Sequence, residues 1–387
     1  MIEIVFWTLA VLVVYVYAGY PLCLALIRAL GGVRPVRRDE GHTPAVTLII
    51  SAYNEAGVIG DKLANSLSLD YPAEKLEVLV VSDASSDGTD AVVQGNGDPR
   101  VHLVRMPERG GKTVGLNAAL LRATGELVVF SDANAMYEKD ALRKLARNFA
   151  DPAVGAVVGE STYSAPEAES QRSEGLYWKY EVAIKRLESE IGSVVGGDGA
   201  IYAIRRRLYV PMTPDALSDF VNPLQIVRKG QRCVYDGESR SIERAAESFE
   251  KEFRRKVRIV NRAWRAMMKM RDLLNPLRFG LMSWELLSHK VLRWLMPFFL
   301  LGVLAANVAL VTSAQLYVVT LGLQVAFYLL ALLGWSLRRR SKLPALVSVP
   351  FYFCLVNVAA AMGIGEALAG RTYTVWTTAR AQDRVGT

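Results

Sequence analysis

Cysteine is scarce in this chain, with three residues among 387. Cys23, Cys233 and Cys354 follow none of the spacings of a disulfide framework or a metal site, and two of them lie in strongly apolar stretches. Internal repeats and low-complexity segments are also missing from the sequence. These absences exclude a disulfide-stapled scaffold and a repeat architecture, so the fold must come from ordinary packing of helices and strands.

Charged side chains are missing from three long stretches, at residues 4–27, 294–337 and 343–365, and 51% of the chain is hydrophobic. As a helix, the first stretch is about 36 Å long, which is enough to cross a bilayer. The second is about 66 Å long as a helix, which predicts two crossings with a turn near residues 313–315. We therefore expect four transmembrane helices. A cleaved signal peptide is disfavoured for the first stretch, because its apolar run is too long and no basic residues precede it.

Basic residues indicate the side on which these helices end. Two dense clusters follow the first and third helices: Arg28, Arg34, Arg37 and Arg38, and then Arg338, Arg339, Arg340 and Lys342. Because Lys and Arg concentrate on the cytoplasmic side of membrane helices, we expect both clusters and the domain between them in the cytoplasm, beside a bacterial inner membrane. Four crossings would place the tail outside although it carries Arg371, Arg380 and Arg384, so the side of the tail stays open.

The net charge of +8 fits contact with anionic membrane lipid rather than with nucleic acid. The basic residues crowd the membrane edges and a predicted helix at residues 249–271. Residues 273–294 mix apolar side chains with Arg278, Glu285, His289 and Lys290, which is typical of an amphipathic helix lying in the membrane interface. We therefore expect membrane lipid as a partner and no nucleic acid.

Residues 44–240 alternate between short apolar strands and helices. Strands are predicted at 46–52, 76–82, 101–104 and 127–131, with helices at 55–69 and 112–123. This order predicts an α/β fold with a mostly parallel sheet flanked by helices. The predicted organisation is a transmembrane helix at 1–30, a cytoplasmic α/β domain at 44–245, basic and interfacial amphipathic helices at 246–290, three transmembrane helices at 291–368 and a tail at 369–387.

Asp132 is the most informative residue for chemistry. It ends an apolar run at 127–131 that is typical of a buried strand, and Asn134 follows two residues later. Ligands of open α/β sheets bind at the carboxyl ends of the strands, and hard oxygen donors there suit Mg²⁺ or Mn²⁺ carrying a phosphate. Taken alone, Asp132 fits equally well as the cap of a following helix.

Polar residues also follow the other predicted strands, and their order carries a resemblance. The series comprises Tyr53-Asn54-Glu55, Asp83 with Asp87-Gly88, Gly111-Lys112, Asp132 with Asn134, Gly196-Gly197-Asp198-Gly199, Leu217-Ser218-Asp219 and the basic run at 253–258. It resembles a family 2 glycosyltransferase with membrane spans on both sides, and is similar in plan to the synthases of cellulose, chitin, hyaluronan and poly-N-acetylglucosamine. The resemblance covers nearly the whole chain and implies a GT-A-like fold. The Asp87-Gly88 pair alone is more typical of a turn.

The resemblance implies a UDP-sugar donor, a divalent metal ion (Mg²⁺ or Mn²⁺) and inverting transfer that gives a β-linked product. Asp83 matches the acid that hydrogen-bonds the uracil ring, and Tyr53 and Glu55 match the base and ribose contacts. Lys112, Arg255 and Arg258 match diphosphate contacts, and Asp132 matches the metal ligand. The family usually has Asp where this chain has Asn134, so one formal charge is missing. Either the affinity for the metal is then weaker, or the metal takes its other oxygens from phosphate and water.

The acceptor hydroxyl must lose a proton as it attacks the anomeric carbon, so the site needs a carboxylate opposite the leaving group. Asp219 occupies the position of the family's general base. Asp215 is the nearby competitor, but Thr213-Pro214-Asp215 looks like the start of a helix, with Asp215 as its cap. Gly197 and Asp198 match the acceptor side, where glycines allow close approach; a turn role fits Asp198 equally well.

One departure concerns the tryptophan on which the acceptor sugar stacks in polymerising synthases. The matching run here is Arg255-Lys-Val-Arg258-Ile259, and Trp264 lies more than one turn further on. The membrane helices and the interfacial helix still match the plan of the polymerising synthases, so the expected function is sugar transfer to a growing polysaccharide. The missing tryptophan leaves single addition to a lipid-linked or polysaccharide acceptor as the alternative. A basic helix on lipid headgroups also fits this run. A non-catalytic nucleotide-sugar sensor and a transporter are remote alternatives, because a sensor needs no base at Asp219 and the apolar helices make a poor pathway.

Overall fold

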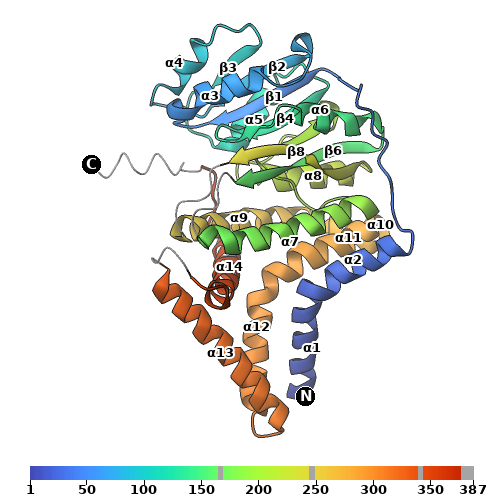
Figure 1. The fold of residues 1–387 in the computed structure, drawn as a ribbon, viewed down its shortest axis with the longest axis vertical. Coiled ribbons are helices and arrows are strands. Elements are labelled where there is room, and N and C mark those ends of the chain that lie inside the picture. The colour runs from blue at the N-terminus through green and yellow to red at the C-terminus, as the bar shows by residue number, and fades with distance from the viewer. Residues whose placement is uncertain (164–168, 244–248, 339–342, 376–387) are drawn as a thin grey trace. The chain divides into compact units, whose positions relative to one another are not determined.

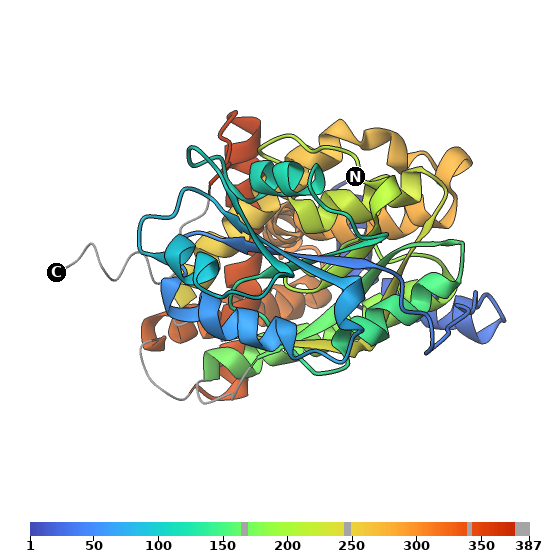
Figure 2. The ribbon, with the colours of Figure 1, turned by 90° about the horizontal axis from the view of Figure 1, so that it is seen from above.

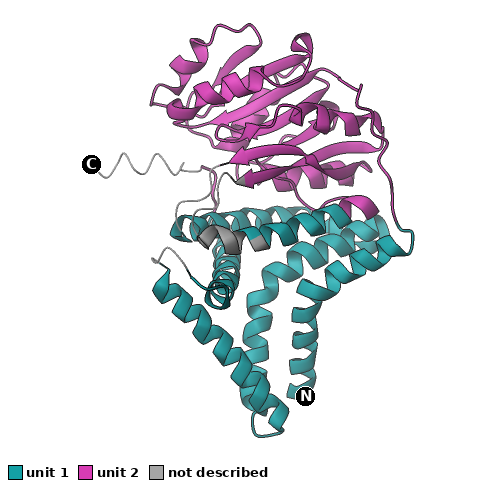
Figure 3. Cartoon of the chain, viewed as in Figure 1, with its two compact units in different colours: residues 1–32, 165–187, 246–371 teal, residues 33–164, 188–245, 372–387 magenta. Residues whose placement is uncertain are grey.

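The computed structural model describes residues 1–163, 169–243, 249–338 and 343–375 (Figure 1). It divides into two compact units (Figure 3). Unit 1 comprises residues 1–32, 165–187 and 246–371, and unit 2 comprises residues 33–164, 188–245 and 372–387. The predicted α/β domain at 44–245 is thus interrupted, because the long helix α7 (Glu169–Ile191) falls mostly in unit 1.

Unit 2 is built on one eight-stranded sheet in the order β3-β2-β1-β4-β7-β6-β8-β5. The strands are β1 Val46–Ala52, β2 Leu76–Ser82, β3 Val101–Arg105, β4 Leu127–Asp132, β5 Met136–Tyr137, β6 Val154–Tyr163, β7 Tyr202–Arg205 and β8 Arg232–Glu243. Strands β3, β2, β1 and β4 are parallel, as are β6 and β8, whereas β7 is antiparallel to both its neighbours and β5 to β8. The predicted α/β class with a mostly parallel sheet is confirmed.

Helices cover both faces of this sheet (Figure 2). They are α3 Ala56–Leu67, α4 Thr89–Gln94, α5 Lys112–Leu120, α6 Ala141–Ala146 and α8 Ser218–Arg228, with short 3₁₀ turns at Ala73–Lys75, Arg147–Ala150 and Arg206–Leu208. Ile50 and Val129 face a core shared with α3 and α6. On the other face, α5 packs closely, since a Cβ added at Gly115 would lie 2.6 Å from Cγ1 of Val81. Strands β1 and β4 are buried on both faces, which is why they read as continuous apolar runs.

The register of the parallel strands aligns their carboxyl ends. Ser51 of β1 pairs with Asp132 of β4, and Ala52 pairs with Ser82 of β2. Tyr53, Asp83 and Asp132 therefore emerge together at one edge of the sheet. Open α/β sheets bind ligands at this edge.

Unit 1 is helical. It contains α1 Ile2–Val14, a π-turn at Tyr15–Gly19, α2 Tyr20–Ala29, α7, α9 Phe249–Lys269, a 3₁₀ turn at Arg271–Leu274, α10 Pro276–Phe279, α11 Leu281–Leu286, a π-turn at Leu287–Val291, α12 Leu292–Leu310, α13 Gln315–Leu337 and α14 Ala345–Leu368. Within the described ranges, four helices are long and apolar enough to cross a membrane: Ile2–Ala29, Leu281–Leu310, Gln315–Leu337 and Ala345–Leu368. The predicted turn near residues 313–315 lies between α12 and α13.

The helix at residues 281–310 runs across a predicted boundary. It is continuous and long enough to cross a membrane, whereas the sequence indicated an interfacial helix to residue 290 followed by a span, and that boundary stays a prediction. One of the polar residues that suggested an interface, His289, has a partner inside unit 1. Nε2 of His289 lies 3.1 Å from a carboxylate oxygen of Glu181 in α7, and Arg293 pairs with the same carboxylate. Charged side chains within apolar helices face the protein interior and pair in this way.

Candidate active site

Three predicted site residues of unit 2 meet beside the end of β4. Asp132, whose side chain is 38% exposed, is the last residue of this strand. Lys112 is the first residue of α5, and its ammonium group forms an ion pair with Asp132 and donates to the carbonyl oxygen of Gly199 at 3.2 Å. The side chain that the sequence assigned to a diphosphate therefore already contacts the side chain assigned to a metal.

Asp219 approaches the same point from the first turn of α8. A Cβ added at Gly199 would lie 3.5 Å from Oδ2 of Asp219 and 3.7 Å from Nζ of Lys112. The amide of Gly197 donates to the backbone oxygen of Asp219 at 2.6 Å. A side chain at position 197 would clash there, since its Cβ would lie 2.6 Å from that oxygen. The Asp219 carboxylate and the Lys112 ammonium group therefore both border the glycine-rich loop at Gly199.

Asp198 lies in the middle of this loop. Its Oδ1 accepts a hydrogen bond from the amide of Ala200 at 3.2 Å, as in a turn. Its Oδ2 is buried and accepts none within the described part of the chain. A buried carboxylate oxygen normally has a hydrogen-bond donor, so this atom can receive one from a bound hydroxyl group.

The residues at Asp132 and Asn134 fit a divalent ion. Both offer hard oxygen donors, both are partly exposed, and the Lys112 ammonium group shows that a cation reaches the Asp132 carboxylate. Among the described residues, no group of three or more His, Cys, Asp or Glu side chains is placed to hold a metal. An ion here would take its remaining ligands from a diphosphate and water, as Mg²⁺ commonly does. The alternative role of Asp132 as a helix cap is wrong, because strand β5 follows it.

Asp83 supports the turn that leads into α5. It is buried, and its carboxylate accepts hydrogen bonds from the amides of Gly110, at 2.8 Å, and Gly111, at 3.0 Å. Gly111 has φ +90°, a conformation that favours glycine. Asp83 thereby positions Lys112, and its role toward a uracil ring stays a prediction.

Tyr53 forms a flat surface together with a residue that the sequence analysis missed. The guanidinium carbon of Arg109 lies 3.7 Å from the centroid of the Tyr53 ring. This cation–π contact brings two planar groups together, and planar groups suit contact with a nucleobase. The sequence does contain a pattern that indicates Arg109, since this residue directly precedes the two glycines of the α5 turn.

Hydrogen bonds join the loop after β1 to the loop after β2. The amide of Asn54 donates to Oγ of Ser85 at 3.1 Å, and the amide of Ala56 donates to Asp87 at 3.0 Å. Burial raises the pKa of Asp87, but hydrogen bonds from Thr89 and from backbone amides outweigh it and lower the pKa overall. The predicted turn role of Asp87-Gly88 is confirmed. Glu55 lies in this loop, and its ribose contact stays a prediction.

The prediction for Asp215 is wrong. Helix α8 begins at Ser218, and Asp215 lies in a separate turn before it, where it accepts a hydrogen bond from Oγ1 of Thr213 at 2.6 Å. Leu217 is extended, so the helix starts one turn later than the Thr-Pro-Asp pattern indicates. Asp219, not Asp215, is therefore the acid of the first turn.

The predicted residues of α9 belong to unit 1. Nε of Arg255 lies 2.7 Å from a carboxylate oxygen of the buried Glu252. Ile259 is 37% exposed, and Trp264 packs edge to face on Trp294, with ring centroids 6.3 Å apart. The diphosphate contacts of Arg255 and Arg258 stay predictions.

A second feature missed by the sequence analysis is the covering of the α5 turn by the end of the chain. A Cβ added at Gly111 would lie 2.0 Å from the carbonyl oxygen of Thr374. Thr374 and Val375 thus lie against Gly111, the residue before Lys112 at the start of α5. Arg380 and Arg384 of the tail lie outside the described residues.

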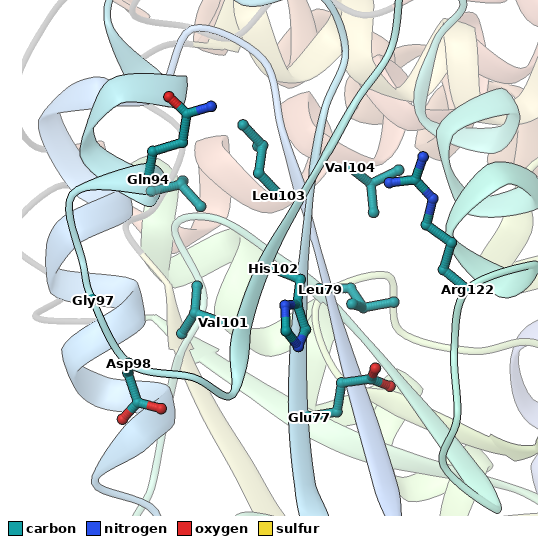
Figure 4. Close-up of a pocket in the computed structure, with 11 residues that line it drawn as sticks. Glu77, Leu79, Gln94, Gly97, Asp98, Val101, His102, Leu103, Val104 and Arg122 are labelled. Carbon is teal, nitrogen blue, oxygen red and sulfur yellow. The ribbon is translucent and has the colours of Figure 1, made fainter.

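A cavity elsewhere in unit 2 does not contain the site. It measures about 610 Å³ and lies along the edge strand β3 (Figure 4). Glu77, His102 and Arg122 are among its lining residues. None of the predicted site residues lines it.

Lys62 is a third feature that the sequence analysis missed. Its side chain is fully buried, its ammonium group contacts the carbonyl oxygen of Ala135, and it lies 4.0 Å from the centroid of the Tyr137 ring. It thus braces the segment that carries Asp132 and Asn134. Burial lowers the pKa of Lys62 to about 7, although Asp132 and Glu243 oppose this shift.

We expect Lys62→Met to flatten the pH dependence of stability. The folded protein releases the Lys62 proton near pH 7 and the unfolded chain releases it near pH 10.5. Between these values the unfolded state binds more protons, so stability rises with pH, by an amount on the order of a few kcal/mol. The unfolding temperature of the full chain in detergent, measured from pH 6.5 to 10, should rise less in Lys62→Met than in the wild type. The control is Lys139→Met, at an exposed lysine, which should behave as the wild type. The same dependence of unfolding temperature on pH in all three proteins would contradict the lowered pKa of Lys62.

Comparison with known proteins fits this geometry. Residues 47–210 match the family model described as Glycosyl transferase family 2. This part of the chain belongs to that family. The predicted resemblance and the GT-A-like fold are confirmed.

Two curated relatives and one solved structure are similar to the chain. It is 38% identical over 118 residues to a beta-monoglucosyldiacylglycerol synthase of Synechocystis, covering 30% of this chain and 25% of that protein. It is 35% identical over 157 residues to a poly-beta-1,6-N-acetyl-D-glucosamine synthase of Staphylococcus aureus, covering 36% and 37%. A mannosyltransferase from Pyrobaculum calidifontis, in complex with GDP-Man and Mn²⁺, is 25% identical, with a TM-score of 0.75 over 96% of this chain and 100% of that one. The chain thus spans less than two fifths of these curated relatives' length, whereas the mannosyltransferase matches it almost throughout.

Proposed function

We propose that the chain is an inverting membrane glycosyltransferase that moves a sugar from a UDP-sugar to a hydroxyl group of a growing polysaccharide. The observation that carries the proposal is the meeting of Asp132, Lys112 and Asp219 at one edge of the sheet. One carboxylate and one cation there suit a diphosphate with its metal, and a second carboxylate suits an acceptor hydroxyl. The polysaccharide synthase among the relatives supports a polymer as the acceptor.

Donor binding is assigned to the residues around the α5 turn. The uracil ring stacks on the flat surface of Tyr53 and Arg109, and Asp83 receives its N–H group. Lys112 contacts the diphosphate from the start of α5, where the backbone amides add positive potential. Mg²⁺ or Mn²⁺ held by Asp132 and Asn134 would neutralise the charge that grows on the leaving diphosphate. The Mn²⁺ in the similar mannosyltransferase structure supports a divalent ion.

The reaction is a single displacement at the anomeric carbon. The acceptor oxygen forms a bond to this carbon as the bond to the diphosphate oxygen breaks, and that bond's electron pair leaves with UDP. Asp219 takes the acceptor proton as general base, and Oδ2 of Asp198 receives a hydrogen bond from an acceptor hydroxyl. Attack from the side opposite the leaving group inverts an α-linked donor and gives a β-linked product.

The chain is placed in a cell membrane with unit 2 in the cytoplasm. The helices suited to membrane crossing and the basic clusters beside residues 28–38 and 338–342 support this location. Nucleotide sugars are then supplied on the side of the catalytic unit.

A donor panel tests the proposal. The purified full chain is incubated with Mn²⁺ and each common UDP-sugar, with GDP-Man as a further donor, and nucleoside diphosphate release and product size are measured. We expect release and saccharide products from at least one UDP-sugar. Release from GDP-Man alone would overturn the UDP assignment, and no transfer from any donor, with donor binding intact, would favour a sensor.

A second candidate is the addition of a single sugar to a lipid. The similar beta-monoglucosyldiacylglycerol synthase favours it, as does Ile259 at the position where polymerising synthases carry tryptophan. Without an aromatic face, the acceptor loses contact energy on the order of 1 kcal/mol and should leave more often. We therefore expect short or modest chains if the product is a polymer.

Ile259→Trp should lengthen the product. The side chain at this position is partly exposed, so a larger ring can be accommodated without disturbing a core. Product length is measured by gel filtration, with Met268→Trp, at another exposed position of α9, as the control. A long wild-type polymer that does not change in Ile259→Trp would show that another ring supplies the platform.

A further inference from the structure

A cleft of about 780 Å³ lies within unit 1 among helices α9, α13 and α14. Its walls are mostly apolar, and aromatic rings from all three helices line it: Phe249, Phe253, Trp335 and Phe351. The rings of Phe249 and Phe351 meet edge to face, with centroids 5.0 Å apart. Cavities of this size bind drug-sized molecules, and an apolar one suits a hydrocarbon chain.

Charged side chains also line the cleft. They are Glu250 and Arg254 of α9 and Arg338, which follows α13 directly. Nε of Arg338 lies 3.1 Å from Glu250, and its guanidinium carbon lies 4.6 Å from the centroid of the Trp335 ring. These contacts hold Arg338 in place, and the three charges sum to +1. One phosphodiester, with a charge of −1, complements them.

The sequence of the helices places this cleft near a membrane surface. It uses α13 from Tyr328 to the end of the helix, and four of the five residues at 338–342 are basic. Such clusters beside a membrane helix attract anionic lipid headgroups, at about 1 kcal/mol per basic residue.

The residues that follow α14 indicate where this helix lies relative to the membrane. Residues 372–375 follow this helix within a few residues and belong to unit 2, where Thr374 lies against Gly111. If α14 crossed the bilayer, as its length and composition permit, these residues would emerge on the side opposite the basic cluster and unit 2. α14 instead packs along the charged helix α9: a Cβ added at Gly363 would lie 2.8 Å from the carbonyl oxygen of Val257.

We propose that α14 lies at the cytoplasmic membrane interface, and that the cleft it forms with α9 and α13 binds an anionic phospholipid. One acyl chain occupies the aromatic cleft, and the phosphate contacts Arg254 and Arg338. The bound lipid thereby joins α9 to the consecutive helices α13 and α14. This inference does not depend on the donor or on the reaction.

Native mass spectrometry of the full chain, released from nanodiscs with equal amounts of phosphatidylglycerol and phosphatidylcholine, tests the site. We expect the wild type to retain phosphatidylglycerol at least about fivefold over phosphatidylcholine. Arg254→Gln combined with Arg338→Gln should bring this ratio close to one. Ala331→Trp, which fills the cleft from α13, should reduce retention of both lipids.

Matched controls separate the cleft from general membrane contact. Arg278→Gln removes a basic residue of α10, and Leu323→Trp adds a ring at an exposed position of α13; neither residue lines the cleft, and both variants should retain lipid as the wild type does. UDP-sugar binding checks that each variant is folded. A wild-type ratio near one, or equal retention in the control and cleft variants, would overturn the proposal.

Two competitors identify the occupant. Inorganic phosphate at millimolar concentration should not displace the lipid, because the acyl chain contributes to binding. Displacement by a polyprenyl phosphate at a lower concentration than by phosphatidylglycerol would show that the cleft is an acceptor site and would contradict the phospholipid assignment.

The placement of α14 is tested with a cysteine introduced at Thr372 and a thiol reagent that does not cross the membrane. We expect the reagent to label this cysteine from the catalytic side only. Labelling from the opposite side only would overturn the placement of α14.

Discussion

Asp219→Asn is expected to reduce sugar transfer by about a hundredfold or more, the usual scale for a general base. The amide keeps the shape of the carboxylate but does not accept a proton. Binding of the UDP-sugar should persist, because the donor residues are left intact. Initial rates and equilibrium binding, both measured on the purified full chain, separate these two effects.

Asp215→Asn is the matched control for this variant. Asp215 is also a carboxylate of unit 2, but it lies in a turn outside the cluster of Asp132, Lys112 and Gly199. It should keep most of the wild-type activity. Full activity in Asp219→Asn together with a large loss in Asp215→Asn or Asp198→Asn would move the base to that residue.

Asp132→Ala is expected to abolish most of the turnover and to weaken the binding of Mn²⁺ with UDP. Removal of the carboxylate takes away the charged oxygen donor of the proposed metal site and also the partner of Lys112. Excess EDTA should inhibit the wild type in the same way. Binding of Mn²⁺ in the presence of UDP, followed by calorimetry, checks the metal role without relying on turnover.

Two further variants separate the metal role from the ion pair. If Asp132 served only to pair with Lys112, Lys112→Met would weaken the binding of Mn²⁺ in the presence of UDP as much as Asp132→Ala does. We expect Mn²⁺ binding to fall more in Asp132→Ala. Asn134→Asp should retain or increase affinity for Mn²⁺, because it adds a formal negative charge beside Asp132. Full activity of Asp132→Ala, or of the wild type in EDTA, would remove the metal from the account.

The catalytic edge of the sheet could be predicted because the central strands β1 and β4 are largely apolar runs that are followed by or end in polar residues. The parallel arrangement then brings these ends together, which placed Asp83 and Asp132 correctly at one edge. The glycine-rich loop at 196–199 was identified by its resemblance, and the structure shows that its backbone lies against Asp219.

Other features depend on tertiary contacts that local patterns do not contain. Lys62 is fully buried although lysine is seldom buried, and its partner is a backbone carbonyl 73 positions away. His289 was one of the polar residues that indicated an interface, but within unit 1 it lies 3.1 Å from Glu181 of α7, more than a hundred positions earlier, and Arg293 pairs with the same carboxylate. The contact of Thr374 with Gly111 joins the end of the chain to the α5 turn, and no periodicity predicts it.

The stereochemistry of the first bond formed tests the central claim most directly. That claim is a single displacement, with the leaving diphosphate held at Asp132 and Lys112 and the acceptor deprotonated by Asp219. The wild-type protein is supplied with an α-linked UDP-sugar and Mn²⁺, and the anomeric configuration of the isolated product is read from its proton NMR spectrum. The account predicts a β-linked sugar; an α-linked product would contradict it.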